Sequence, residues 1–174
     1  YNQDMRRLWI VIFIVCLGVG GWLIYDNWHW INANFLHRYP KVPDFYLQDY
    51  LDKYHALAEF SGRPLVINLW AADTPFSADE LRDLAKIQDE FGDRLAIVAI
   101  NRGEPVDFAK NFTDRLGVSS RIFILLDPKD SFYKAIGGFQ TPETLFVNRE
   151  GDIVDHKRGH MKLNEMRQRV EKIL

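Results

Sequence analysis

The feature that most constrains this chain is an unbroken apolar run followed at once by a turn and a charged helix. Residues 65–70 read LVINLW, which predicts a buried strand. Thr74 and Pro75 end the run, and Asp79 and Glu80 open a segment whose apolar side chains recur at helical spacing. We expect Thr74 to cap this helix, Pro75 to lie in its first turn, and Glu80 to be a helix-start acid that favours the helix dipole.

The remainder of the chain alternates predicted strands and helices. Strands are expected at residues 42–47, 95–101, 122–127, 143–148 and 153–158, and helices at residues 50–60, 79–91, 106–116, 131–136 and 163–174. Continuous apolar strands between helices indicate a sheet that is covered on both faces. We therefore predict an α/β fold that ends in a hairpin and a terminal helix.

An uncharged stretch precedes the folded part. Residues 8–25 would span roughly 27 Å as a helix, close to the ~30 Å core of a bilayer. Arg6 and Arg7 lie before the stretch and a cluster of aromatic residues follows it, which favours a cytoplasmic N-terminus and a periplasmic remainder. The alternative is a cleaved signal peptide, although the usual small-residue cleavage site is missing.

These patterns predict three regions in a protein of the bacterial inner membrane. Residues 1–30 form a cytoplasmic stub and a transmembrane helix, residues 31–41 a juxtamembrane linker, and residues 42–174 the folded domain. The bilayer and other integral membrane subunits are the expected partners of the helix, whose glycines permit close packing. A net charge of −2 gives no reason to expect a nucleic-acid partner.

Cysteine and histidine usage limits the chemistry. The single cysteine, Cys16, excludes an intramolecular disulfide, a dithiol couple and a cysteine-rich metal site. His156 and His160 lie four residues apart without a closing set of ligands, so we expect a polar strand face there, and neither a metal nor a cofactor.

The turn resembles the active-site region of membrane-anchored thioredoxin-like proteins of the TlpA, ResA and CcmG kind. That family carries Cys-x-x-Cys where this chain has TPFS at residues 74–77. A second match is GGFQTP at residues 137–142, similar to the family's loop before the final hairpin, which implies that Pro142 is cis and faces the turn. The resemblance covers residues 42–174 and implies a thioredoxin-like sheet flanked by helices, preceded by a single N-terminal transmembrane helix.

The departure from the family pattern determines the expected function. Thr74 and Ser77 are alcohols, whereas thiol-disulfide exchange needs a thiolate and a resolving thiol, so we expect no enzyme and no catalytic residue. The resemblance also implies a groove that holds an extended peptide, and this needs no sulfur. Its candidate residues are Thr74, Pro75, Phe76, Ser77, Phe139, Thr141 and Pro142. The alternative is that Phe76 and Phe139 are simply packed.

The sequence thus predicts a redox-inactive, membrane-anchored binding or structural protein. We expect an accessory or assembly subunit of a larger membrane complex, of respiratory or photosynthetic type. The alternatives are a thiol-disulfide factor in cytochrome c maturation, which the resemblance alone implies, and a peptide-holding chaperone.

Overall fold

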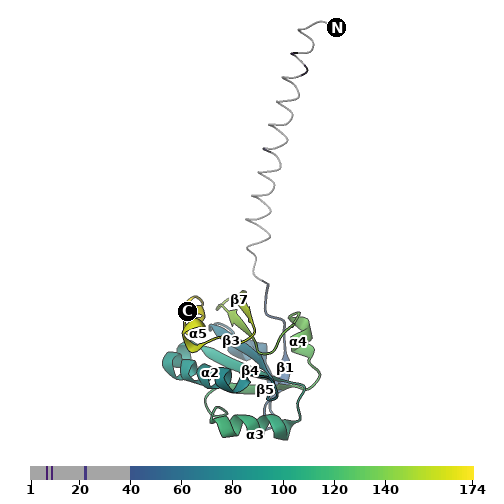
Figure 1. Ribbon diagram of the computed structural model, residues 1–174, viewed down its shortest axis with the longest axis vertical. Helices are drawn as coiled ribbons and strands as arrows, with labels where there is room; N and C mark the ends of the chain where they lie inside the picture. The colour runs from purple at the N-terminus through teal and green to yellow at the C-terminus, as the bar shows by residue number, and fades with distance from the viewer. Residues whose placement is uncertain (1–6, 8, 10–21, 23–39) are drawn as a thin grey trace. The chain divides into compact units, whose positions relative to one another are not determined.

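The computed structural model describes residues 7, 9, 22 and 40–174 (Figure 1). Within these residues, no helix is long and apolar enough to cross a membrane. The expected transmembrane stretch, residues 8–25, lies outside the described residues except at Trp9 and Trp22. Pro40–Leu174 is one compact unit.

The unit is built on one seven-stranded mixed sheet with the strand order β2-β1-β5-β4-β3-β6-β7. The strands are β1 (Tyr46–Gln48), β2 (Tyr54–Ala56), β3 (Leu65–Trp70), β4 (Ala96–Arg102), β5 (Phe123–Asp127), β6 (Glu143–Val147) and β7 (Ile153–Arg158). The three central strands β3, β4 and β5 are parallel, and β6, β7 and the β1–β2 hairpin join them in antiparallel register. The predicted apolar run is therefore a central strand of the sheet.

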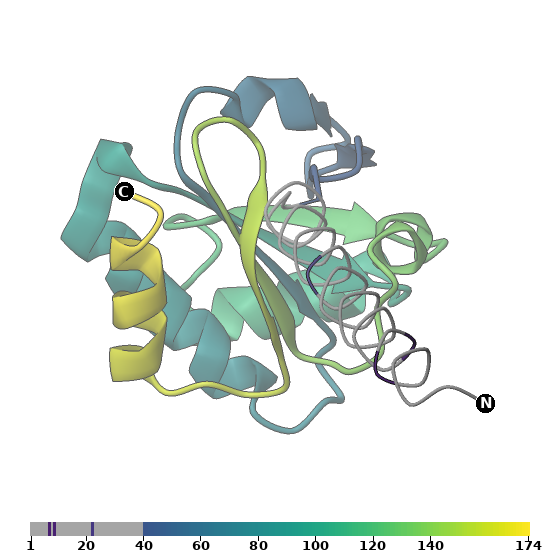
Figure 2. The ribbon, with the colours of Figure 1, turned by 90° about the horizontal axis from the view of Figure 1, so that it is seen from above.

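Helices occupy most of the predicted positions. They are α2 (Ser77–Phe91), α3 (Val106–Leu116), α4 (Ser131–Ala135) and α5 (Leu163–Glu171), with short 3-10 helices η2 (Leu57–Phe60) and η3 (Gly92–Arg94). Helices α2 and α5 cover one face of the sheet, and α4 lies on the other (Figure 2). This is the thioredoxin-like arrangement that the sequence predicted.

The alternation of side chains along β3 divides the core in two. Val66 and Trp70 pack with α2, α3 and α5, whereas Leu65, Ile67 and Leu69 pack on the opposite face with η2 and α4. All six residues of β3 are buried, because both faces of the sheet are covered.

The helix predicted at residues 50–60 is wrong. Asp49 accepts hydrogen bonds from the backbone N–H groups of Leu51 (2.7 Å) and Lys53 (3.0 Å), which closes a turn instead. His55 then lies between the carboxylates of Asp49 (3.1 Å) and Glu59 (2.9 Å). The segment therefore forms the β1–β2 hairpin and ends in η2.

The chain enters the sheet beside the turn between β6 and β7. The C=O of Pro40 accepts a 2.8 Å hydrogen bond from the N–H of Ile153, and the N–H of Val42 donates to the C=O of Gly151 (3.1 Å). Lys41 forms an ion pair with Asp152 (2.8 Å). The first residues of the unit are thus bonded to the far end of the hairpin.

Candidate functional site

Four loops meet at one end of the sheet, at the ends of its central strands. They are residues 71–76 after β3, 103–105 after β4, 137–142 before β6 and 159–162 after β7. In the strand register, the end of β3 lies beside the end of β4 and the start of β6, and the start of β6 lies opposite the end of β7. All seven candidate residues predicted from the sequence belong to two of these loops or to the first residue of α2.

The turn at residues 74–77 is closed by its own backbone. The N–H of Ser77 donates to the C=O of Thr74 (3.3 Å), and Phe76 adopts a left-handed conformation with φ of 72°. Helix α2 begins at Ser77, with Phe76 as its N-cap residue and no side-chain cap. The prediction that Thr74 caps the helix and that Pro75 lies in its first turn is therefore wrong. The backbone turn places both residues before the helix.

Glu104 holds the start of this loop, and the sequence analysis missed it. Both of its carboxylate oxygens lie 2.9 Å from the backbone N–H of Ala72, and Asn101 donates to Oε2 at 2.5 Å. The sequence signal was a charged residue three positions after the strand predicted at residues 95–101.

The loop before β6 carries the expected cis peptide bond, Thr141–Pro142. Glu143, fully buried at the start of β6, accepts hydrogen bonds from the backbone N–H groups of Phe139 (3.1 Å) and Gln140 (3.4 Å). The C=O of Pro142 is bonded to the N–H of Gly159 (2.9 Å). By contrast, the N–H and C=O groups of Thr141 have no hydrogen-bond partner within residues 40–174.

Three side chains from β4 and β7 contact this loop or the glutamate that follows it. Nε of Arg158 lies 3.0 Å from Oε1 of Glu143, and Nε2 of His156 lies 2.5 Å from it. Arg102, at the end of β4, donates to the hydroxyl of Thr141, pairs with Asp130 and stacks over a tyrosine ring. His156 was expected to lie on a polar strand face. In the structure it also has a partner in the buried carboxylate of Glu143.

Apolar side chains are exposed around these loops. Phe76 is 57% exposed and Phe139 is 83% exposed, so the alternative that both are packed is wrong. Val106 and Phe108, at the start of α3, are 47% and 49% exposed, and the sequence analysis did not select them. Exposed aromatic and aliphatic groups thus lie in or directly after three of the four loops.

Glu80 lies in the first turn of α2, as predicted, but its environment is not that of a surface acid. Its side chain is fully buried between α2 and the sheet, where Oε1 accepts hydrogen bonds from Asn68 (3.2 Å) and Thr144 (3.0 Å). Burial raises the pKa of Glu80 to about 7, and the hydrogen bond from Thr144 opposes the rise. Oε2 lies 3.6 Å from Nδ1 of His160, which follows β7 rather than belonging to it.

Comparison with known proteins identifies the family. The family described as "AhpC/TSA family" matches residues 40–156. The chain belongs to the AhpC/TSA family. It is 24% identical to the thioredoxin-like protein YneN of Bacillus subtilis, covering 96% of this chain and 99% of that protein. It is 26% identical to the thiol-disulfide oxidoreductase ResA of Geobacillus thermodenitrificans, covering 99% and 98%.

Solved structures agree on the fold of this AhpC/TSA chain. The putative thiol:disulfide interchange protein DsbE from Chlorobium tepidum superposes with a TM-score of 0.72 at 18% identity, covering 78% of this chain and 96% of that one. The pneumococcal exposed lipoprotein thioredoxin of Streptococcus pneumoniae superposes with a TM-score of 0.64 at 22% identity, covering 75% and 99%.

The relatives correct one expectation. Full-length relatives are named thiol-disulfide oxidoreductases, so this chain belongs to a family of enzymes, and the expectation of a non-enzyme class is wrong. That expectation rested on the hydroxyl-bearing residues at positions 74 and 77. These residues determine the chemistry of one turn, but they do not determine the class to which the protein belongs.

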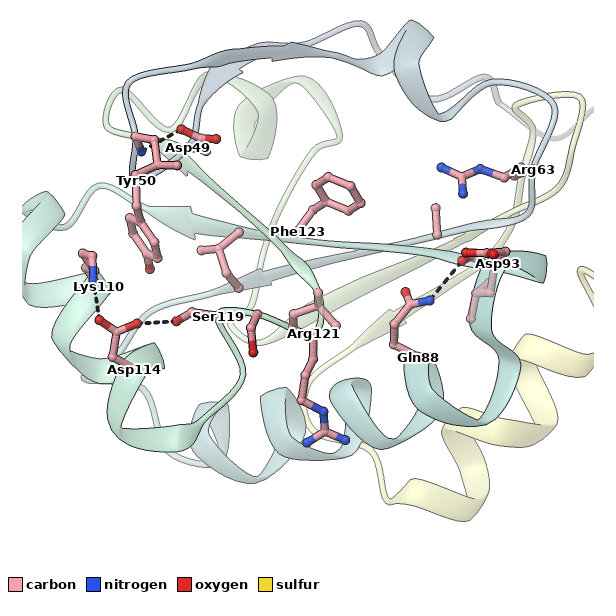
Figure 3. Close-up of a pocket in the computed structure, with 16 residues that line it drawn as sticks. Asp49, Tyr50, Arg63, Gln88, Asp93, Lys110, Asp114, Ser119, Arg121 and Phe123 are labelled. Atoms are coloured by element: carbon pink, nitrogen blue, oxygen red, sulfur yellow. Dashed lines mark hydrogen bonds and ion pairs between the residues drawn. The ribbon is translucent and has the colours of Figure 1, made fainter.

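Within the described residues, no group of three or more His, Cys, Asp or Glu side chains is placed to hold a metal ion. A cavity of about 490 Å³ lies at the opposite end of the strands, near the starts of β4 and β5 (Figure 3). Tyr50 lines it, and its hydroxyl lies 3.1 Å from that of Thr113. Burial raises the pKa of Tyr50 to about 12. This cavity shares no residue with the four loops.

Arg102→Ala is expected to lower the free energy of unfolding of this AhpC/TSA chain by about 2 kcal/mol, because it removes charge-assisted hydrogen bonds to Asp130 and Thr141. Urea unfolding followed by tryptophan fluorescence measures the loss. Arg121→Ala is the matched control, since among residues 40–174 the side chain of Arg121 pairs with the surface residue Asp89, and its loss is expected to cost under about 1 kcal/mol. Equal losses would contradict a bracing role for Arg102.

Proposed function

We propose that this AhpC/TSA chain binds an extended segment of a partner polypeptide across the cis-proline loop. The observation that carries the proposal is the peptide group of Thr141, whose N–H and C=O are unbonded within residues 40–174 although the loop on either side of it is bonded. An extended strand supplies the complementary N–H and C=O groups. Phe76 and Phe139 offer apolar surface to its side chains.

The proposal concerns binding and rests on no sulfur. Thiol-disulfide exchange proceeds through a mixed disulfide between a thiolate and its substrate, and residues 74–77 hold two hydroxyl groups instead. Backbone pairing beside Pro142 and apolar contact do not depend on that bond. A site of this kind binds a client segment through shape and hydrogen bonds alone.

We place this binding site on a membrane-anchored subunit. The uncharged stretch at residues 8–25 and the preceding arginines support an anchor with an extracytoplasmic domain. The name of one fold relative, an exposed lipoprotein thioredoxin, is compatible with such a location. The partner in this proposal is another subunit of a membrane assembly, of respiratory or photosynthetic type, to which the chain is an accessory or assembly subunit.

A second candidate is a client-holding role in thiol-disulfide metabolism, such as cytochrome c maturation. The names of the full-length relatives favour it. It differs from the first candidate in the occupant of the groove, which would be a cysteine-containing client held transiently rather than a permanent partner.

Phe139→Ala is expected to weaken partner capture on the order of tenfold, because truncating an exposed aromatic anchor removes about 1–2 kcal/mol of binding. The full chain is purified in mild detergent through a C-terminal tag, and co-purifying polypeptides are quantified by native sizing and mass spectrometry. Leu51→Ala is the matched control, since Leu51 is equally exposed (83%) but lines the cavity at the opposite end of the strands.

Equal capture by wild type and Phe139→Ala, with weaker capture by Leu51→Ala, would contradict the proposal. It would indicate that the binding surface lies at the opposite end of the strands, where Leu51 lines the cavity. One membrane assembly travelling with the wild-type chain supports the subunit role. A spread of cysteine-containing clients supports the second candidate.

A further inference from the structure

The cavity near the starts of β4 and β5 forms because β1 leaves the sheet early. β1 pairs with β5 at one position, Gln48 with Leu126, whereas β4 pairs with all five residues of β5. The turn closed by Asp49 directs the chain away directly after that position. Among the described strands, the edge of β5 at Phe123–Leu125 therefore has no partner on that side, and the cavity lies along it (Figure 3). Its volume of about 490 Å³ is within the roughly 300–1,000 Å³ of small-ligand sites.

Apolar side chains form much of the cavity wall. Phe123 and Leu51 both line it and are exposed to solvent. The ring of Phe123 is held edge-on against that of Phe60, with centroids 5.3 Å apart and planes inclined by 81°. Ile122 and Ile124, its neighbours in the chain, also line the cavity. A ligand with an apolar body would remove this surface from water, which favours binding.

The charged side chains of the cavity leave one cation and one anion without a partner. Six charged residues line it: Asp49, Arg63, Asp93, Lys110, Asp114 and Arg121. Four of them form ion pairs within residues 40–174, namely Lys110–Asp114, Arg121–Asp89 and Asp49–His55. The side chains of Arg63 and Asp93 form neither an ion pair nor a hydrogen bond within the same residues.

Both of these charges lie at the same end of the cavity. Arg63 and Asp93 each follow a glycine in the left-handed conformation, Gly62 (φ 76°) and Gly92 (φ 54°), and each lies just before a central strand. The two strands, β3 and β4, are adjacent and begin in register. Figure 3 shows Arg63 on one side of the cavity and Asp93 on the other. The pair therefore frames one end of the cavity without closing it.

We infer that this cavity binds a free α-amino acid with a large apolar side chain. The guanidinium of Arg63 pairs with the ligand's carboxylate, for which its forked donors are suited. The carboxylate of Asp93 accepts hydrogen bonds from the ligand's ammonium group, and the apolar side chain packs on Phe123. A ligand with one charge would leave Arg63 or Asp93 unpaired. This inference goes beyond the proposed function, because the cavity shares no residue with the four loops.

The test is calorimetric titration of the full chain with L-phenylalanine. The chain is held in lipid nanodiscs, because the alkyl chains of a detergent would compete for an apolar cavity. Binding is expected with a dissociation constant on the order of 0.1 mM. Phenylalaninamide lacks the carboxylate and 3-phenylpropanoate lacks the ammonium group, so each is expected to bind on the order of tenfold more weakly. At about pH 6 the α-amino group is protonated and the carboxyl group is ionised, so the comparison isolates the two charges.

Two variants assign the charges to their partners. Arg63→Gln is expected to weaken phenylalanine binding about tenfold and to leave phenylalaninamide binding unchanged, because the amide has no carboxylate to lose. Asp93→Asn is expected to weaken phenylalanine binding and to leave 3-phenylpropanoate binding unchanged. Lys110→Gln is the matched control, since it removes a cation of the same cavity that is already paired with Asp114. It is expected to change the binding of none of the three ligands.

The inference is refuted if phenylalanine does not bind, or if it binds both Arg63→Gln and Asp93→Asn as tightly as wild type. It is also refuted if an acetylated and amidated peptide of about five apolar residues binds more tightly than phenylalanine and loses affinity in Leu51→Ala. In that case the open edge of β5 pairs with a polypeptide strand. Phe139→Ala is expected to leave phenylalanine binding unchanged, so amino-acid binding and partner capture fail independently.

Discussion

Replacing Thr74 and Ser77 together by cysteine is expected to create a working thiol pair. The two residues are the ends of a backbone-closed turn, which brings their Cα atoms within the ~7 Å limit of a turn and so near the range of a disulfide. The thiol introduced in place of Ser77 would lie at the first position of α2, where helix N-termini lower thiol pKa values. The rate of insulin reduction by dithiothreitol measures the gain. The double variant is expected to be faster than wild type by about tenfold or more, which is roughly the effect of one pKa unit on the fraction of thiolate.

The control is Thr74→Cys alone, because a single thiol has no resolving partner within the turn. Both variants are made with Cys16 replaced by serine, so that the native thiol does not contribute. A double variant that forms no disulfide under mild oxidation would show that the turn at residues 74–77 does not have the geometry its family relationship implies.

Glu80→Gln is expected to change the pH dependence of stability more than any other single substitution of an acid in this unit. The pKa of Glu80 is about 7 in the folded protein, against an ordinary glutamate value of 4.5 that applies to the unfolded chain. The folded state therefore holds a proton that the unfolded state has lost between these values, and stability falls as pH rises from about 4.5 to about 7. The difference between the two pKa values corresponds to about 3 kcal/mol, lost fully above pH ~7.

The glutamine variant cannot ionise and keeps an acceptor for Asn68 and Thr144. It is expected to match wild type at acid pH and to be more stable than wild type by about 3 kcal/mol at pH ~8. Urea unfolding at the two pH values measures the difference, with Asp79→Asn as the exposed control. A constant difference between the variant and wild type at both pH values would contradict the raised pKa of Glu80.

The parts of the fold that were predictable have strong local patterns. Helix α3 begins and ends at the predicted residues, because its apolar spacing is regular and Gly117 takes the left-handed conformation after its last turn. The β6–β7 hairpin follows from the apolar segment at residues 144–147 and the turn containing Gly151 that precedes β7. The hairpin after β1 was missed because side-chain hydrogen bonds from Asp49 outweigh a weak helical pattern.

The candidate site was predictable in position but only partly in chemistry. Phe76 and Phe139 could be selected from the turn and loop, and the cis peptide bond before Pro142 from the family resemblance. The burial of Glu80 could not, because it depends on Asn68 from β3 and Thr144 from β6, which are distant in sequence. A polar residue inside the run LVINLW was the available signal, since an amide in a buried strand needs a polar partner.

The entry point of the chain lies away from the proposed binding site. Pro40 and Val42 are bonded beside the β6–β7 turn, whereas the cis-proline loop lies at the other end of β6. The point where the chain enters the unit and the proposed binding site therefore lie at opposite ends of β6 and do not compete for backbone groups. Under the proposed function, a client segment can therefore exchange at the cis-proline loop without breaking the hydrogen bonds of Pro40 and Val42.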